Sequence, residues 1–160
     1  MSFCSFIATN YEMPEIASKA KSITVKEAIE LGMEPHELVP WDEMDPDAEI
    51  LFVENEEDLN ELAITKDGYY DVSHYTSYSF IYEVNFIYSE SRVKQLLAYL
   101  KENCKEGQVV ELWGVWIGDE EKHIPHSRCS YEELSLDHLM QLYNSEHDNY
   151  KEQQCIVFER

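Results

Sequence analysis

The residues of this chain best suited to chemistry lie together in one polar segment. His123, His126 and Cys129 follow one another at intervals of three residues and offer two imidazoles and a thiol. Zinc binds such groups, and a site needs three or four of them. The candidates for a further ligand are Asp119, His138 and His147. The pattern indicates either a metal site, with zinc as the cofactor, or an ordinary solvated loop.

Nucleophilic catalysis is a second possibility. Cys129 or Cys4 would be the nucleophile and a histidine the base, held within hydrogen-bond reach. The chain contains no G-x-S-x-G, P-loop, G-x-G-x-x-G or H-E-x-x-H motif, and its five glycines are few for a phosphate-binding loop. A small metal-dependent or cysteine-dependent enzyme is therefore the alternative hypothesis, and a protein with neither catalysis nor cofactor is the leading one.

The strongest compositional feature is negative charge. Thirty-three Asp and Glu stand against twelve Lys and Arg, which gives a formal net charge of −21. This balance opposes nucleic acid as a direct ligand and opposes docking on anionic membranes, because both depend on cationic side chains. It favours a basic protein partner, whose association the field would accelerate. The alternative is that acidity only keeps a bacterial or halotolerant protein soluble.

The charge is concentrated in an acidic first half, residues 27–65. Fourteen acids and no Lys or Arg lie between Lys26 and Lys66. Trp41 and Tyr70 are the aromatic candidates for anchors in a protein interface. For Trp41 the alternative is a side chain that packs its own loop onto a core. The carboxylates predicted to contact the partner are Asp42, Glu43, Asp45, Asp47, Glu56, Glu57 and Asp58.

The elements that must position these residues centre on a predicted β-α-β unit at residues 78–117. Residues 78–88 are aromatic or β-branched at most positions, and every second residue from Phe80 to Tyr88 is apolar or aromatic on one face, which is typical of a strand. Ser89 is a suitable N-cap, and apolar residues then recur at helical spacing up to Leu100. Residues 109–117 are apolar on both faces, as in a central strand. The linker favours a parallel crossover, with an antiparallel return as the alternative.

Other segments complete the expected fold. A helix begins after Thr24 and ends at Gly32, and a second helix spans about residues 131–143, with Ser130 or Ser135 as its cap. Further strands are expected at residues 3–8, 50–53 and 154–158. The sequence thus predicts a single α+β domain over residues 1–160, with a mixed sheet of about four to six strands and about two to four helices.

The four cysteines are scattered without a C-x-x-C pair, and neither a signal sequence nor a membrane-spanning stretch is expected. A cytoplasmic protein with reduced thiols is predicted. The leading hypothesis is an immunity or inhibitor protein that masks a basic protein such as a nuclease toxin. A third hypothesis is a homo-oligomeric accessory protein that associates through its aromatic strand. The high charge of each subunit opposes self-association.

Overall fold

The computed structural model describes residues 2–35, 40–55, 57, 61–119, 122–144 and 151–160. The chain divides into two compact units, one formed by residues 1–17 and 60–160 and the other by residues 18–59. Each unit encloses its own cluster of buried apolar side chains. The expectation of a single domain over residues 1–160 stays a prediction.

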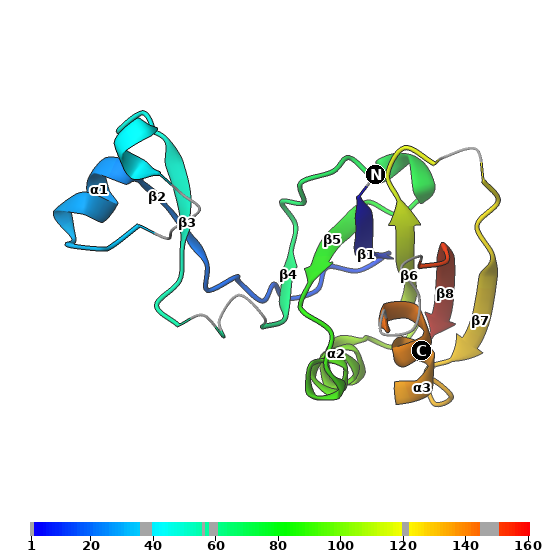
Figure 1. Ribbon diagram of the computed structural model, residues 1–160. Helices are drawn as coiled ribbons and strands as arrows, with labels where there is room; N and C mark the ends of the chain where they lie inside the picture. Colours follow the sequence, from blue (N-terminus) through cyan, green and yellow to red (C-terminus); the bar gives the residue numbers. More distant parts are fainter. Residues whose placement is uncertain (1, 36–39, 56, 58–60, 120–121, 145–150) are drawn as a thin grey trace. The chain divides into compact units, whose positions relative to one another are not determined.

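The larger unit is built on a mixed sheet of six strands in the order β4-β5-β1-β6-β8-β7 (Figure 1). Every neighbouring pair is antiparallel except β7 and β8, which are parallel. With its helices, this sheet confirms the predicted α+β class. The strands are β1 (Phe3–Thr9), β4 (Ala63–Thr65), β5 (Phe80–Asn85), β6 (Val109–Trp116), β7 (His126–Ser130) and β8 (Gln154–Glu159).

The predicted β-α-β unit consists of β5, helix α2 (Glu90–Asn103) and β6. β5 and β6 are each antiparallel to β1, which lies between them, so they are parallel to each other. The expected parallel crossover is therefore confirmed. β5 and β6 are not neighbours in the sheet, because β1 lies between them. The crossover through α2 therefore passes over β1.

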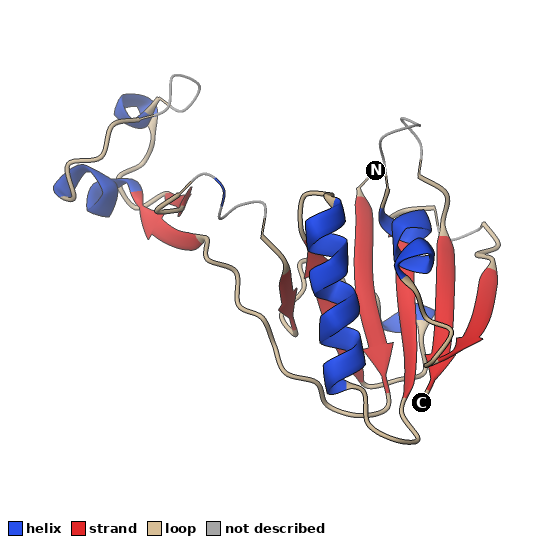
Figure 2. Ribbon diagram, turned by 90° about the horizontal axis from the view of Figure 1, so that it is seen from below, coloured by secondary structure: helices blue, strands red, loops and turns tan. Residues whose placement is uncertain are grey.

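Helix α2 covers one face of the sheet, together with α3 (Leu136–Tyr143), and Figure 2 shows both helices on the same side. The Ser89 hydroxyl accepts a hydrogen bond from the Arg92 backbone N–H at 3.2 Å, which caps the first turn as predicted. Leu96 and Leu100 are completely buried against the sheet. Their helical spacing places them on one face, where burial of each stabilises the fold by about 1.5–3 kcal/mol.

Strand β6 is covered on both faces, as its continuous apolar sequence predicts. Val110 and Leu112 belong to the cluster beneath the helices, whereas Trp113 and Val115 belong to a cluster on the opposite face. On that second face the Trp113 ring stacks on Phe6 with centroids 5.7 Å apart. The chain between β4 and β5 completes the cover, including a 3₁₀ turn at Ser73–Tyr75.

Two expectations for the region after β6 are wrong. The segment predicted as a polar loop contains strand β7, which lies at the sheet edge and pairs in parallel with β8. Its side chains are mostly exposed, so the sequence lacks the apolar alternation of a half-buried strand.

Helix α3 begins later than residue 131. Ser130 and Glu133 do exchange the hydrogen bonds of a capping box, at 2.9 and 3.2 Å, but they close only a turn. The helix follows the second predicted cap, Ser135, whose backbone N–H donates to His138 Nδ1 at 3.1 Å.

Where the structure describes it, the smaller unit, residues 18–59, contains a two-stranded antiparallel sheet and one α-helix. Thr24 and Glu27 form the predicted capping box at the start of that helix. Gly32, with φ of 71°, adopts the left-handed conformation that follows many helices. The elements are β2 (Lys21–Thr24), α1 (Val25–Glu30), a 3₁₀ turn (Trp41–Glu43) and β3 (Glu49–Phe52).

Candidate functional site

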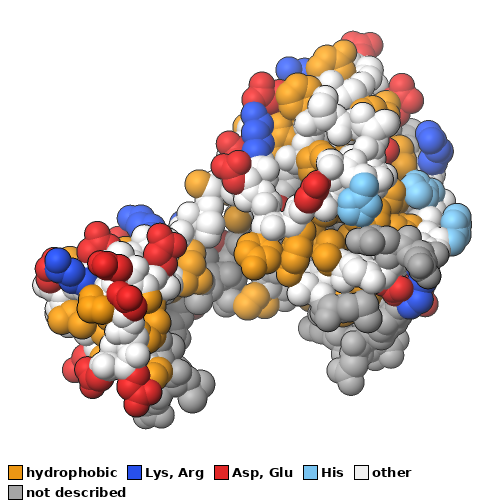
Figure 3. All heavy atoms as spheres, turned by 90° about the horizontal axis from the view of Figure 1, so that it is seen from above, with side chains coloured by type: hydrophobic (Ala, Val, Ile, Leu, Met, Phe, Trp, Pro, Cys, Tyr) orange, Lys and Arg blue, Asp and Glu red, His pale blue; other side chains and the backbone are white. Residues whose placement is uncertain are grey.

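The acidic residues of the smaller unit are all displayed to solvent wherever the structure describes them. Ten such carboxylates lie within residues 18–59, and every one is exposed. Of the predicted partner contacts, Asp42, Glu43, Asp45, Asp47 and Glu57 belong to this exposed set. Glu56 and Asp58 lie outside the described residues. Figure 3 shows acidic side chains distributed over the visible face of this unit.

Among the described residues, these carboxylates also have no ion-pair partner. Ion pairs do occur in the larger unit, for example between Glu90 and Lys94 at 2.6 Å. Glu27 is held by the Thr24 backbone N–H, which lowers the pKa of its carboxyl group. The smaller unit also contains Lys19, Lys21 and Lys26, so it carries an excess of exposed negative charge rather than negative charge alone.

Trp41 lies beneath this charged surface. Its side chain is only 8% exposed and packs with Val25 and Ala28 in the core of the smaller unit. This is the second of the two arrangements expected from the sequence, in which the tryptophan packs its own loop. Trp41 thus holds the acidic 3₁₀ turn in place and is not itself an exposed anchor.

Tyr70 is half-buried on the second face of the larger unit's sheet, whereas its neighbour Tyr69 is 86% exposed. The two rings meet edge to face with centroids 4.8 Å apart. Sequence reasoning selected the less accessible member of this pair. The preceding Asp67-Gly68 turn indicates a surface position for Tyr69.

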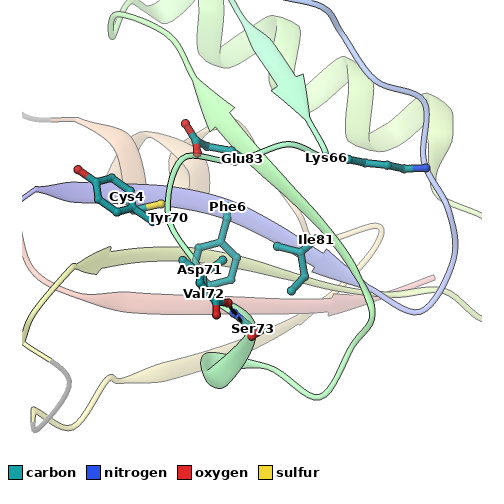
Figure 4. Close-up of a pocket in the computed structure, with 10 residues that line it drawn as sticks. Cys4, Phe6, Lys66, Tyr70, Asp71, Val72, Ser73, Ile81 and Glu83 are labelled. Atoms are coloured by element: carbon teal, nitrogen blue, oxygen red, sulfur yellow. Dashed lines mark hydrogen bonds between the residues drawn. The ribbon is translucent and has the colours of Figure 1, made fainter.

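Beside Tyr70 is a small pocket of about 170 Å³ (Figure 4). Cys4 and Phe6 approach it from β1, Ile81 and Glu83 from β5, and Tyr70 to Ser73 from the segment that closes over them. The two carboxylates in its lining, those of Glu83 and Asp71, already accept hydrogen bonds from the protein. Glu83 accepts a hydrogen bond from the Tyr69 backbone N–H at 2.6 Å, and Asp71 accepts two from Ser73.

The thiol in this pocket is poorly suited to nucleophilic attack. Burial, with a smaller contribution from Glu83, raises the pKa of Cys4 to about 11. Burial also raises the pKa of Cys129. Since the thiolate is the nucleophile, both predicted cysteines are held in the unreactive protonated form at neutral pH.

His126 and Cys129 are separated by the alternation of β7. The His126 ring packs edge-on against Trp113 with centroids 5.0 Å apart, whereas Cys129 packs into the cluster under the helices. They therefore lie on opposite faces of the sheet. His123 is exposed in the preceding segment, and among the described residues no three His, Cys, Asp or Glu side chains are grouped to hold a metal.

Of the further zinc ligands considered from the sequence, two already interact with other groups and the third is not described. His138 Nδ1 accepts the backbone N–H of Ser135, and Asp119 pairs with Lys122 at 2.7 Å. His147 lies outside the described residues. The structure thus does not bring the predicted zinc ligands together within the part of the chain it covers.

No protein-family model, curated protein or solved structure matches this chain. None of the described helices combines the length and the apolar character needed to cross a bilayer.

Proposed function

We propose that the protein is a small cytoplasmic binding protein, most concretely an immunity or inhibitor protein, whose residues 18–59 dock a basic protein such as a nuclease toxin. The observation that carries the proposal is the set of ten exposed carboxylates without ion-pair partners among the described residues. A nuclease presents cations where it binds phosphate, and these carboxylates match that charge.

The smaller unit also exposes apolar side chains between its acids. Ile29 is 56% exposed, and Leu31 and Leu51 are each 68% exposed. Protein interfaces combine apolar contact area with charges at their rims. We therefore assign affinity mainly to these aliphatic side chains and steering mainly to the carboxylates.

The cytoplasmic location is part of the same proposal. All four cysteines are free, and three of them are buried. Free buried thiols are compatible with a reducing compartment, where nuclease toxins would act.

The test begins with capture of partners from a lysate of the native host at low salt, followed by elution at high salt and mass spectrometry. The affinity of the captured protein is then compared between the native chain and a variant that combines Asp42→Asn, Glu43→Gln, Asp45→Asn and Asp47→Asn. The amide side chains keep the Asp45 oxygen that accepts the residue 47 N–H. We expect affinity to fall on the order of tenfold or more, chiefly through slower association.

A matched control changes the same number of exposed acids on the larger unit, through Asp67→Asn, Glu102→Gln, Glu106→Gln and Glu132→Gln. This control changes net charge equally and should retain most of the affinity. Binding that is insensitive to salt, or equally weakened by both variants, would exclude docking through residues 18–59.

A further inference from the structure

A second pocket lies in the larger unit, on the face of the sheet that α2 and α3 cover. Its volume is about 330 Å³, within the range of small-molecule sites. Phe3 and Ser5 of β1 line it, as does the end of β5 with the chain that follows. Tyr143 at the end of α3 and Lys151 complete the lining. None of the described lining residues carries a carboxylate, although the chain contains thirty-three Asp and Glu.

Lys151 supplies the one cationic group among the lining residues. Its Nζ lies 4.8 Å from the centroid of the Phe3 ring. Within the described part of the chain, Lys151 forms no ion pair, and burial lowers the pKa of its ammonium group. A partly desolvated cation without a counter-charge gains stabilisation from any anion that enters.

The rest of the lining sets the nature of that anion. Phe86 and Ile87 provide apolar contact, and Ile87 is 60% exposed. Ser5 contributes a neutral polar group to the lining from β1. One lysine neutralises one negative charge, and the other polar groups of the lining, on Ser5, Asn85, Tyr88 and Tyr143, are neutral, so a second negative charge would have no counter-charge among the lining residues. No arginine is present in the lining to bind a phosphate in bidentate fashion.

We infer that this pocket binds a small organic monocarboxylate, with the carboxylate at Lys151 and its hydrocarbon part against Phe3, Phe86 and Ile87. Binding here is independent of docking through residues 18–59. It gives the larger unit a ligand of its own.

Trp116 offers a direct probe of occupancy. The Trp116 Nε1–H donates to the Lys151 carbonyl oxygen at 2.6 Å, and the centroids of the Trp116 and Phe3 rings are 5.3 Å apart. The chain has three tryptophans. Trp113 donates to Glu111 and belongs to the cluster on the opposite face of the sheet, and Trp41 belongs to the smaller unit. Their indole N–H signals serve as internal references.

The experiment is a titration of the whole ¹⁵N-labelled chain with phenylacetate, followed through the three indole N–H signals. The expected result is a saturable shift of the Trp116 signal, with half-saturation on the order of 1 mM for so small a ligand. Phenylacetamide and phenyl phosphate are titrated in parallel. An equal response to the neutral amide, a stronger response to the phosphate, or no saturable response to phenylacetate would overturn the proposal.

Lys151→Met keeps much of the apolar stem and removes the charge, and we expect affinity for phenylacetate to fall about tenfold or more. Lys105→Met is the matched control, because Lys105 also lies over an aromatic ring, that of Tyr11, and does not line the pocket. If both variants bind phenylacetate as the native chain does, Lys151 does not hold the carboxylate and the proposal fails. Unchanged Trp113 and Trp41 signals establish that the variants are folded.

Discussion

The carboxylate of Glu83 on β5 accepts the backbone N–H of Tyr69 at 2.6 Å, which fastens the segment after β4 over the sheet. Gly68 makes this approach possible, because a Cβ there would lie 2.8 Å from Glu83 Oε2 and 3.2 Å from Glu83 Cβ. One hydrogen bond thus positions both the exposed Tyr69 ring and the wall of the pocket beside Tyr70.

Removal of that carboxylate should release the segment. We expect Glu83→Ala to lower the free energy of unfolding by about 1–3 kcal/mol, because the Tyr69 N–H loses a charged acceptor. Gly68→Ala should also destabilise the native chain, through the close contact with Glu83. Chemical denaturation of the two single variants and the double variant gives the coupling. Strict additivity of the two effects would contradict the contact between them.

The core of the smaller unit depends on Trp41. Trp41→Ala should cost about 3–5 kcal/mol, as for other large buried aromatic side chains, and should unfold residues 18–59. Backbone amide spectra would then lose dispersion for these residues. Leu51→Ser is the comparison, since Leu51 is 68% exposed and its replacement should leave the unit folded. Native-like spectra for Trp41→Ala would show that the packing with Val25 and Ala28 is dispensable.

Tyr143, which is buried, and Tyr131, which is partly buried, should respond in opposite directions to loss of the hydroxyl group. The Tyr143 hydroxyl is buried without a hydrogen-bond partner in the described structure, so Tyr143→Phe should raise the free energy of unfolding, by about 1 kcal/mol. The Tyr131 hydroxyl donates to the Lys101 carbonyl oxygen at 2.5 Å, so Tyr131→Phe should lower it by a similar amount. Thermal or denaturant unfolding of both variants measures the contrast. A loss of stability in Tyr143→Phe would indicate a partner for its hydroxyl.

The buried thiols make stability fall at high pH. Burial raises the pKa of Cys4 from 9.0 to about 11, so the folded state retains a proton that the unfolded state loses. Below pH 9 both states are protonated and this group contributes no pH dependence. Between pH 9 and about 11 the free energy of unfolding should decrease, because the unfolded state binds fewer protons. Burial also raises the pKa of Cys104 and Cys155, which adds to the same slope.

Denaturant midpoints measured at intervals from pH 8 upward would test this slope. In Cys4→Ala the decrease should be shallower than in the native chain. An unchanged slope would mean that Cys4 titrates alike in both states.

The strand-helix-strand unit was predictable because its signals are local. Side-chain alternation, the Ser89 cap and the helical spacing up to Leu100 each act within a few residues. Strand β7 was not predictable from the sequence. It forms through parallel pairing with β8, and its mostly exposed side chains show no alternation of apolar and polar residues. The sequence also gave no sign that β1 would separate β5 from β6, since pairing between distant segments leaves no local pattern.

The features of the candidate surfaces were likewise predictable only where they depend on local sequence. Charge could be counted along the sequence, and the exposure of Asp42, Glu43, Asp45 and Asp47 follows the expectation for unpaired carboxylates. The burial of Trp41 depends on contacts with α1 that spacing does not specify. The pocket at Lys151 gathers residues from β1, β5 and α3, and no motif joins them.

The central place of β1 has a consequence for how the chain acquires its fold. β1 pairs with both β5 and β6, which are synthesised long after it, so the strand must wait unpaired while the intervening chain is made. We expect slow folding, on the millisecond to second scale typical of non-local β pairing, and a need for protection of the nascent β1 from aggregation. Stopped-flow refolding would measure that rate, and microsecond folding would show that β1 finds its neighbours without such delay.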